Sequence, residues 1–508
     1  MVSASHLFRL IQSLSGSEKR YCKIFILNNL PDNIEGNYVK LFDAVVKQKA
    51  YDEKHLRKTL HIKGFHVVKH ELYKLLLRAL CFYHREYSVQ SRLHEMLRTI
   101  EILFERTLYD ECVTQIRKAK KLASLHENHL VMLDLLHWES NVMGAKEYAD
   151  VTSHHLNTLM EQKKKLLENY KLICSAQHIH DKLFQSQSGA VHAKSKNAVN
   201  RLRKVMDFSL LKKDLPFDAN LHIYTSAYYY FRTIGDFRKA YQHIKQLTEI
   251  MQAHPHQLED KQKKYIVSIM NTTIALAELS RYDEALKTLE SIKTITPKNP
   301  RIAVLVFSIT SLLSLSILHS TGEFEKAVLL VSDEIEKGLE KFKGKIDSLR
   351  HLEFQFLIAY SYFGAGQYSR TIEWANKIVN NPSKDFMMDL QSYARLLHMM
   401  AHLEKGNRAI ITYLGKSAQR YFEKDKHAYR LEKTISGFFS KKLSLDASAK
   451  ENRKAWKELK ALTEKLLQNP FEAKILNYID LPSWLESKIQ NRPFAEVVRE
   501  KTNISKIK

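Results

Sequence analysis

Residues 280–297 read SRYDEALKTLESIKTITP and carry the pattern that decides the fold. A small residue, Ser280, is followed by Tyr282 and then by Ala285. A small residue just past a helix can take the left-handed conformation that ends it, and the aromatic ring then fills the crevice between two helices. Apolar residues continue at helical spacing until Pro297 ends the second helix. The stretch therefore predicts a tight turn between two antiparallel helices.

The same phrase recurs along the chain at nearly constant spacing. The copies that begin at Gly235, Ser280, Gly322 and Gly366 are 45, 42 and 44 residues apart, and an earlier copy begins at Thr107. The other members of these copies are Phe237 and Ala240, Phe324 and Ala327, Tyr368 and Thr371, and Tyr109 and Cys112. The interval of 128 residues between Thr107 and Gly235 predicts two further, degenerate copies. Repetition of one helical hairpin at a fixed period is typical of helical solenoids.

Over residues 93–412 the chain resembles the tetratricopeptide-repeat superfamily. That family's aromatic, small, large, small and proline positions are filled by Tyr282, Ala285, Leu289, Ile292 and Pro297. The chain departs from the family in lacking its early tryptophan, and its period is about ten residues longer than the family's usual 34. The resemblance implies a divergent, all-α, right-handed solenoid of antiparallel helix pairs with a concave face. It carries over no ligand-binding residue.

The composition supports an all-α chain with more than one domain. Among 508 residues only 14 are Gly and 9 are Pro, and 44% are hydrophobic. An all-β chain needs turn residues roughly every 8–12 positions, and a disordered chain has less apolar content. We predict an N-terminal helical domain at 1–92, a repeat solenoid at 93–412, and a C-terminal helical cap with a basic tail at 413–508.

The formal net charge of +24 gathers at the two ends of the chain. Residues 1–92 carry +8 and residues 341–508 carry +13, whereas residues 221–340 are neutral. Summed positive charge raises affinity for polyanions. The neutral middle predicts a groove for a protein partner, and the basic ends keep a nucleic-acid partner possible.

Two basic stretches supply the candidate polyanion-binding residues. In the third predicted helix of the N-terminal block, Lys74 and Arg78 lie opposite the apolar stripe, as in a helix-turn-helix recognition helix. The second stretch, 161–213, contains 12 basic and 4 acidic residues. The candidates are Lys74, Arg78, Arg85, Lys163, Lys164, Lys165, Arg201, Arg203 and Lys204. Ordinary solvation of outer helix faces is the competing interpretation.

No group of residues predicts catalysis, a cofactor site or a metal site. Among the closely spaced histidines, His66 and His70 have the i, i+4 spacing of one helical face, and no third ligand accompanies them. Residues 338–345 lack the spacing and the Ser/Thr of a phosphate loop. The four cysteines stand far apart, which is typical of reduced, cytosolic thiols. We therefore expect a protein that is not an enzyme.

Residues 302–322 contain no charged side chain and are long enough to cross a bilayer. Ser and Thr interrupt the run, and it occupies a first-helix position of the repeat, so we predict a buried core helix and no membrane span. The leading hypothesis is a non-enzymatic, cytoplasmic scaffold or adaptor that binds a protein or peptide in its concave groove. The alternative is a nucleic-acid- or ribosome-associated regulator with a helix-turn-helix-like N-terminus and a repeat sensor domain. A membrane-anchored assembly factor is a third class that depends on 302–322 alone.

Overall fold

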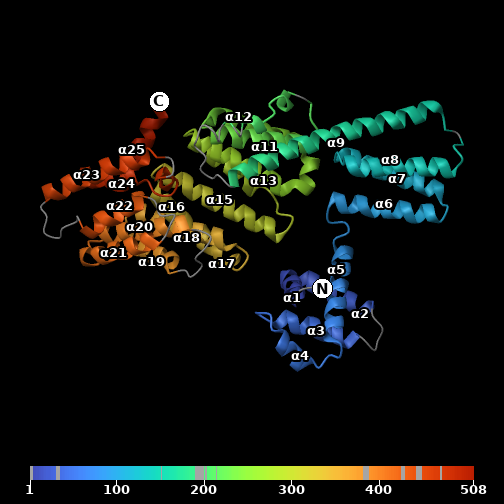
Figure 1. Ribbon diagram of the computed structural model, residues 1–508, viewed down its shortest axis with the longest axis horizontal. Helices are drawn as coiled ribbons and strands as arrows, with labels where there is room; N and C mark the ends of the chain where they lie inside the picture. Colours follow the sequence, from blue (N-terminus) through green and yellow to red (C-terminus); the bar gives the residue numbers. More distant parts are fainter. Residues whose placement is uncertain are drawn as a thin grey trace. The chain divides into compact units, whose positions relative to one another are not determined.

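The computed structural model is all-helical in the residues that it describes, which confirms the predicted all-α class, while the right-handed solenoid stays a prediction (Figure 1). It describes residues 4–29, 35–149, 151–188, 200, 203–212, 214–380, 388–424, 430–441, 449–469 and 472–507, and these residues contain no strand. They form two compact units, residues 1–171 and 172–508, whose boundary falls inside one long helix. The division at residues 92 and 412 follows composition and motif, and it stays a prediction.

The first unit begins with five helices that share one core. These are α1 (Ala4–Ser13), α2 (Gly16–Asn28), α3 (Glu35–Lys47), α4 (Glu53–Leu60) and α5 (Phe65–Tyr83). α5 buries Leu72, Leu76 and Ala79 in this core, beside α2 and α3. Lys69 is buried as well, and its Nζ lies 2.9 Å from Glu53 Oε2, so an ion pair joins α5 to α4.

Four longer helices follow in the chain. These are α6 (Val89–Glu105), α7 (Tyr109–Leu125), α8 (His129–Ala145) and α9 (Ser153–Ser188). α6, α7 and α8 pack against one another in order, and α9 diverges from α8 (Figure 1). The two hairpins expected between residues 107 and 235 are replaced, among the described residues, by α8 and the 36-residue α9. α9 contains neither Gly nor Pro, so nothing in its local sequence ends it earlier.

The second unit consists mainly of antiparallel helix pairs that pack on their neighbours. Its helices after α9 are α11 (Phe217–Thr233), α12 (Phe237–Ala253), α13 (Leu258–Glu278), α14 (Tyr282–Lys293), α15 (Pro300–Ser320), α16 (Phe324–Leu330), α17 (Glu336–Lys341), α18 (Ser348–Gly364), α19 (Tyr368–Val379), α20 (Met388–Glu404), α21 (Arg408–Lys424), α22 (Arg430–Lys441), α23 (Ala449–Leu467), α24 (Leu481–Gln490) and α25 (Phe494–Ile507). The close pairs include α11 with α12, α13 with α14, α18 with α19, and α21 with α22. Pro297 lies in the connection after α14.

The turns inside these pairs share one backbone geometry. Gly235, Gly322 and Gly366 have φ of +83°, +74° and +73°, and Ser280 and Thr107 adopt the same region at +59°. In each turn the next N–H donates to the carbonyl five residues earlier, at 2.8–3.0 Å. This C-terminal cap satisfies a carbonyl that the helix end leaves without a partner. The pattern in the sequence missed further turns of this kind, at Glu127, Glu147, Gly406 and Asn491.

The residues that follow each turn differ in burial. The small residues are fully buried where the two helices approach most closely, namely Cys112, Ala240, Ala285, Ala327 and Thr371. Among the aromatic residues, Phe324 is fully buried, Tyr282 and Tyr368 are half-buried, and Phe237 is 37% exposed. The rings of Phe231 and His243 stack at 5.2 Å between α11 and α12. They fill that crevice in place of Phe237.

One second helix of a pair is interrupted by a π-helical turn. Residues Val331–Ile335 form this turn between α16 and α17. Glu334 occupies the position expected to be apolar, but it is exposed, and Ile335 is fully buried instead. The extra residue of a π-turn shifts the helix face by one position, which explains the change in register.

α15 covers most of the uncharged segment at 302–322. By length and composition it is a candidate membrane span, the one found among the described residues. In the structure it packs against α13, α14, α16 and α18. Its residues Ile309, Leu315 and Ile317 are buried in this unit. These contacts include α15 in the helix packing of the second unit, and the absence of a membrane span stays a prediction.

The end of the chain, residues 472–507, packs across the first helices of earlier pairs. Tyr360 Oη on α18 accepts a hydrogen bond from the Asp480 N–H at 2.9 Å. Arg499 Nε donates to the Gly322 carbonyl at 3.0 Å, so α25 contacts the turn after α15. The sequence predicts a C-terminal cap, and in the structure the end of this segment reaches back to the turn at Gly322.

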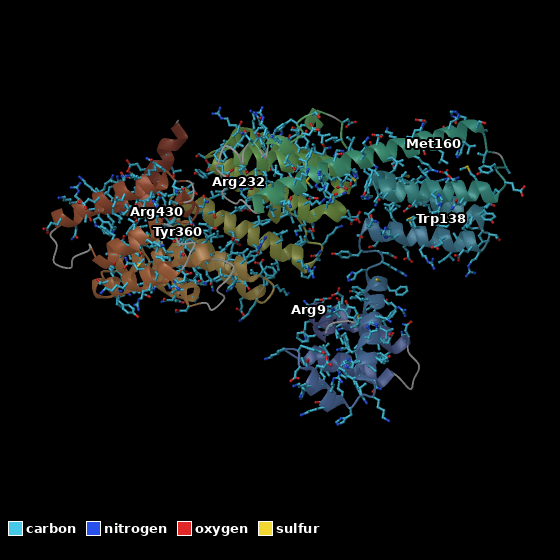
Figure 2. All side chains as sticks on the ribbon, in the orientation of Figure 1. Arg9, Trp138, Met160, Arg232, Tyr360 and Arg430 are labelled. Carbon is cyan, nitrogen blue, oxygen red and sulfur yellow. The ribbon has the colours of Figure 1, made fainter. Side chains whose placement is uncertain are left out.

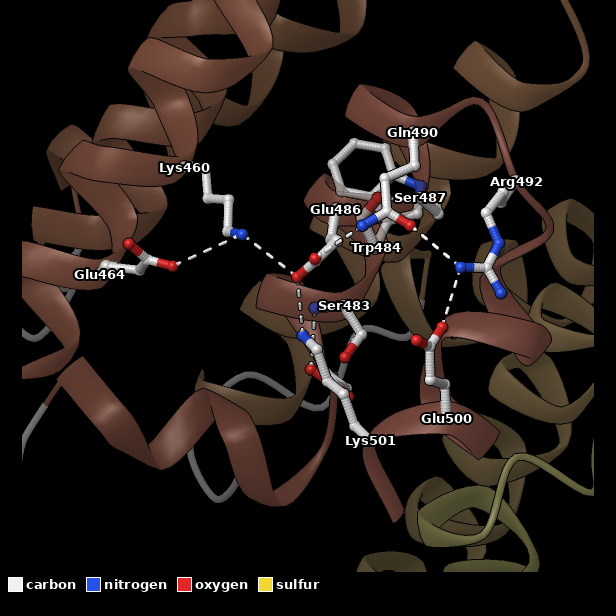
Figure 3. Close-up of polar contacts among 11 residues, drawn as sticks. Lys460, Glu464, Ser483, Trp484, Glu486, Ser487, Gln490, Arg492, Glu500 and Lys501 are labelled. Atoms are coloured by element: carbon white, nitrogen blue, oxygen red, sulfur yellow. Dashed lines mark hydrogen bonds and ion pairs between the residues drawn. The ribbon is translucent and has the colours of Figure 1, made fainter. Parts of the chain in front are cut away.

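A polar network joins the last three helices to one another (Figure 3). Glu486 on α24 accepts from Lys460 on α23 at 3.1 Å and from Lys501 on α25 at 3.2 Å. Burial by itself raises the pKa of Glu486, but these hydrogen bonds outweigh it and the pKa is lowered. Arg492 pairs with Glu500 at 2.8 Å. The network holds α23, α24 and α25 as one layer.

Candidate functional site

The predicted basic stripe on α5 is exposed, and its charges are partly neutralised. Lys74 Nζ lies 3.0 Å from Glu71 Oε1, and Arg85 Nε lies 3.6 Å from Glu86 Oε1. Arg78 is exposed four residues after Lys74 on the same helix face, and Arg85 lies in the turn that follows α5. The stripe therefore presents less net charge than its lysine and arginine residues indicate.

The second set of basic candidates is divided between the two units, with Lys163, Lys164 and Lys165 in the first and Arg203 and Lys204 in the second. Lys163 Nζ donates to Ser140 Oγ on α8 at 3.1 Å, and Lys164 pairs with Glu161 at 2.8 Å. Lys165 borders the cavity described below. Of the remaining candidates, Arg203 and Lys204 are exposed, and Arg201 lies outside the described residues.

Histidine is abundant, but no group of three or more potential ligands for a metal occurs in the described parts of the chain. The most deeply buried histidine, His319, has its Nε2 2.7 Å from Ser361 Oγ, and its ring stacks on Phe324 at 5.5 Å. Burial lowers the pKa of His319 to about 3. It is a neutral part of the core.

This histidine predicts a pH dependence of stability. In the unfolded chain a histidine has a pKa near ~6.5, so the unfolded state binds one more proton than the folded state between about pH 6.5 and pH 3. The stability that rests on neutral His319 is therefore lost as the pH falls through this window. In the variant His319→Gln, the urea concentration at half-unfolding should change less with pH than it does in the native chain. His70→Gln, at an exposed position, serves as the control. An unchanged pH profile for His319→Gln would assign the dependence to other groups.

A long open cavity of about 1110 Å³ lies between α7, α8 and α9 in the first unit. It exists because α9 diverges from α8, while α7 and α8 stay in contact. α7 buries Cys112 and Ala119 in the core, and its buried Ile116 lines the cavity together with the exposed Val113 and Leu125. We call this cavity the α7–α9 groove.

The floor of the α7–α9 groove is apolar. Val113 and Leu125 on α7 line it, and they are 37% and 52% exposed. Met132, Val142, Met143, Val151 and Leu166 add further apolar surface. Near the groove α9 exposes more of its apolar side chains, such as Met160, which is labelled in Figure 2 and is 54% exposed. A connected set of exposed apolar side chains marks a surface suited to a partner.

The rim of the groove is basic. Arg117, Lys120 and Lys121 border it on α7, and Lys165 borders it on α9. The carboxylate on this rim is Glu139, which pairs with Lys120 at 2.7 Å. The groove thus combines an apolar floor with uncompensated positive charge.

Sequence reasoning singled out Lys165, but it missed the groove. The residues of α7 at 113, 117, 121 and 125 follow helical spacing and mix apolar with basic types, which is a detectable signal. The cavity itself depends on the angle between α8 and α9, which no local pattern encodes. The predicted location, within 221–340, followed the neutral charge instead.

The chain was compared with known proteins. No protein-family model matches it, and no curated protein or solved structure gives a significant match.

Proposed function

We propose that this protein is a non-enzymatic scaffold that binds a polypeptide segment of another protein. In this proposal the helix pairs form a right-handed, tetratricopeptide-like solenoid. The observation that carries the proposal is the α7–α9 groove, where apolar side chains lie open along a helical channel. Helix-in-groove docking uses such a channel.

The dimensions of the groove favour a polypeptide over a small molecule. From Val113 to Leu125 the lining runs along about three turns of α7, or roughly 18 Å. Pockets for small molecules enclose most of their ligand, whereas this groove is open along its length. A helix of about 12 residues has the length to cover it.

The nucleic-acid alternative has weaker support. Two of the three basic candidates on and after α5 pair with carboxylates, and the lysines of α9 point to different partners. A polyanion gains most from several phosphate contacts made together. The ion pairs of Lys74, Arg85 and Lys164 with carboxylates reduce the positive charge that these candidates offer to a polyanion.

Selection of helical peptides by display on the full chain tests the proposed function. The selected peptides should lose roughly tenfold or more in affinity for the variant Leu125→Asp, because an apolar contact is replaced by a buried charge. Leu167→Asp on α9 is the matched control, since Leu167 is 55% exposed and does not line the groove. Failure to select any peptide, or equal loss in both variants, would refute the groove as the binding site.

A further inference from the structure

We propose that the partner segment in the α7–α9 groove is an amphipathic helix with acidic flanks. This inference rests on the proposed function and names the chemical class of its ligand. The apolar face of such a helix covers the floor, and its carboxylates meet the basic rim. Both features lie on one surface of the first unit.

The charges of the rim are available to a ligand. Arg117, Lys121 and Lys165 form no ion pair within the part of the chain that the structure describes. Lys120 and Glu139 neutralise each other. A bound helix with Glu or Asp along its edges supplies the missing counter-charges, and a basic helix is repelled.

The geometry of the rim matches the edges of a helix. Arg117 and Lys121 are four residues apart on α7, in the same helical row as Val113 and Leu125, so they project from successive turns of one wall of the groove. Lys165 belongs to α9, the opposite wall. Two carboxylates at i and i+4 on one edge of the ligand helix therefore face Arg117 and Lys121 on α7. A third carboxylate on the other edge faces Lys165 on α9.

The apolar floor also favours an amphipathic helix over a nucleic acid as the ligand. Val113, Leu125 and Met143 offer contacts that a phosphate backbone does not use. An amphipathic helix uses both the floor and the rim.

Two synthetic helical peptides test the inference on the full chain. They share the same apolar face, and one carries Glu and the other Lys at the flanking positions. Fluorescence anisotropy should show the Glu peptide binding roughly tenfold more tightly, because about three exposed ion pairs each contribute modestly. High salt should reduce this preference.

A pair of charge-reversal variants provides the matched control. The double variant Arg117→Glu with Lys121→Glu should reverse the preference between the two peptides. Lys118→Glu with Lys164→Glu makes the same change of net charge at exposed positions outside the groove, and it should keep the preference. If this control reverses the preference equally, the rim has no specific role and the inference fails.

The remaining outcomes distinguish the inference from the proposed function. One outcome is that the Glu and Lys peptides bind equally tightly to the native chain and both lose affinity in Leu125→Asp. That result would overturn the inference of acidic flanks and leave the proposed binding function intact. Absence of binding by both peptides and by every display-selected peptide would overturn both. A concentration-dependent dimer that is lost in Leu125→Asp would assign the groove to a second copy of the chain and overturn the inference.

Discussion

Replacing Gly364 with alanine is expected to lower the free energy of unfolding of the second unit by about 3 kcal/mol. A Cβ built at Gly364, near the end of α18, would lie 2.0 Å from a ring carbon of Phe324. The ring cannot move away easily, because it is fully buried and lies 5.7 Å from Tyr360 and 5.4 Å from Phe494. Urea unfolding followed by tryptophan fluorescence measures this change, since three of the four tryptophans belong to the second unit.

A matched substitution separates this clash from the general effect of adding a methyl group to a helix. Gly36 on α3 has no other atom within 4 Å of its added Cβ, so Gly36→Ala should be neutral or slightly stabilising. Adding Phe324→Leu to Gly364→Ala should recover part of the loss, because the ring is removed from the contact. If Gly364→Ala is as stable as the native chain, the ring does not lie against Gly364.

Replacing Trp484 with alanine should cost about 4 kcal/mol. Trp484 on α24 is fully buried, and its ring lies 5.5 Å from Trp456 on α23. Its Nε1–H also donates to Glu404 Oε1 on α20 at 2.7 Å. The substitution removes both a large apolar contact and one of the two partners of the half-buried Glu404 carboxylate, which also pairs with Lys488.

Two further variants make the Trp484 result specific. Trp484→Phe keeps much of the packing and removes the hydrogen bond, so it should cost less than Trp484→Ala. Tyr413→Ala, at a side chain that is 66% exposed, should change stability by at most about 0.5 kcal/mol. Limited proteolysis should cleave within 472–507 faster in Trp484→Ala. Unchanged proteolysis and stability would show that the tail does not depend on this anchor.

Both predictions concern contacts between residues far apart in the sequence. Phe324 and Gly364 belong to successive hairpins, and Trp484 and Glu404 are separated by 80 residues. The repeated phrase identified Phe324 as a ring in a crevice, but it gave no indication that the receiving surface is Gly364. The tail was expected to be a cap, but its contact with the turn at Gly322 follows only from the packing of α25.

The candidate site was less predictable than the fold. The turns at Gly235, Ser280 and Gly366 could be derived because a left-handed residue and the hydrogen bonds around it involve only neighbouring residues. The α7–α9 groove could not be derived in this way. It requires that α9 continue without a break and diverge from α8, and both depend on packing along the whole helix.

The sequence by itself determined that the chain is all-helical, where five of its hairpins turn, and which small residues lie between the helices of those pairs. These properties depend on backbone conformation and on helical spacing, which act within a few residues. The tertiary structure alone decided that an apolar channel opens beside α7 and that Phe237 stays outside its crevice. It also decided that the end of the chain packs on α18 and on the turn after α15. The reason is that each of these outcomes depends on which side chains fill the space between helices, and distant residues compete for that space.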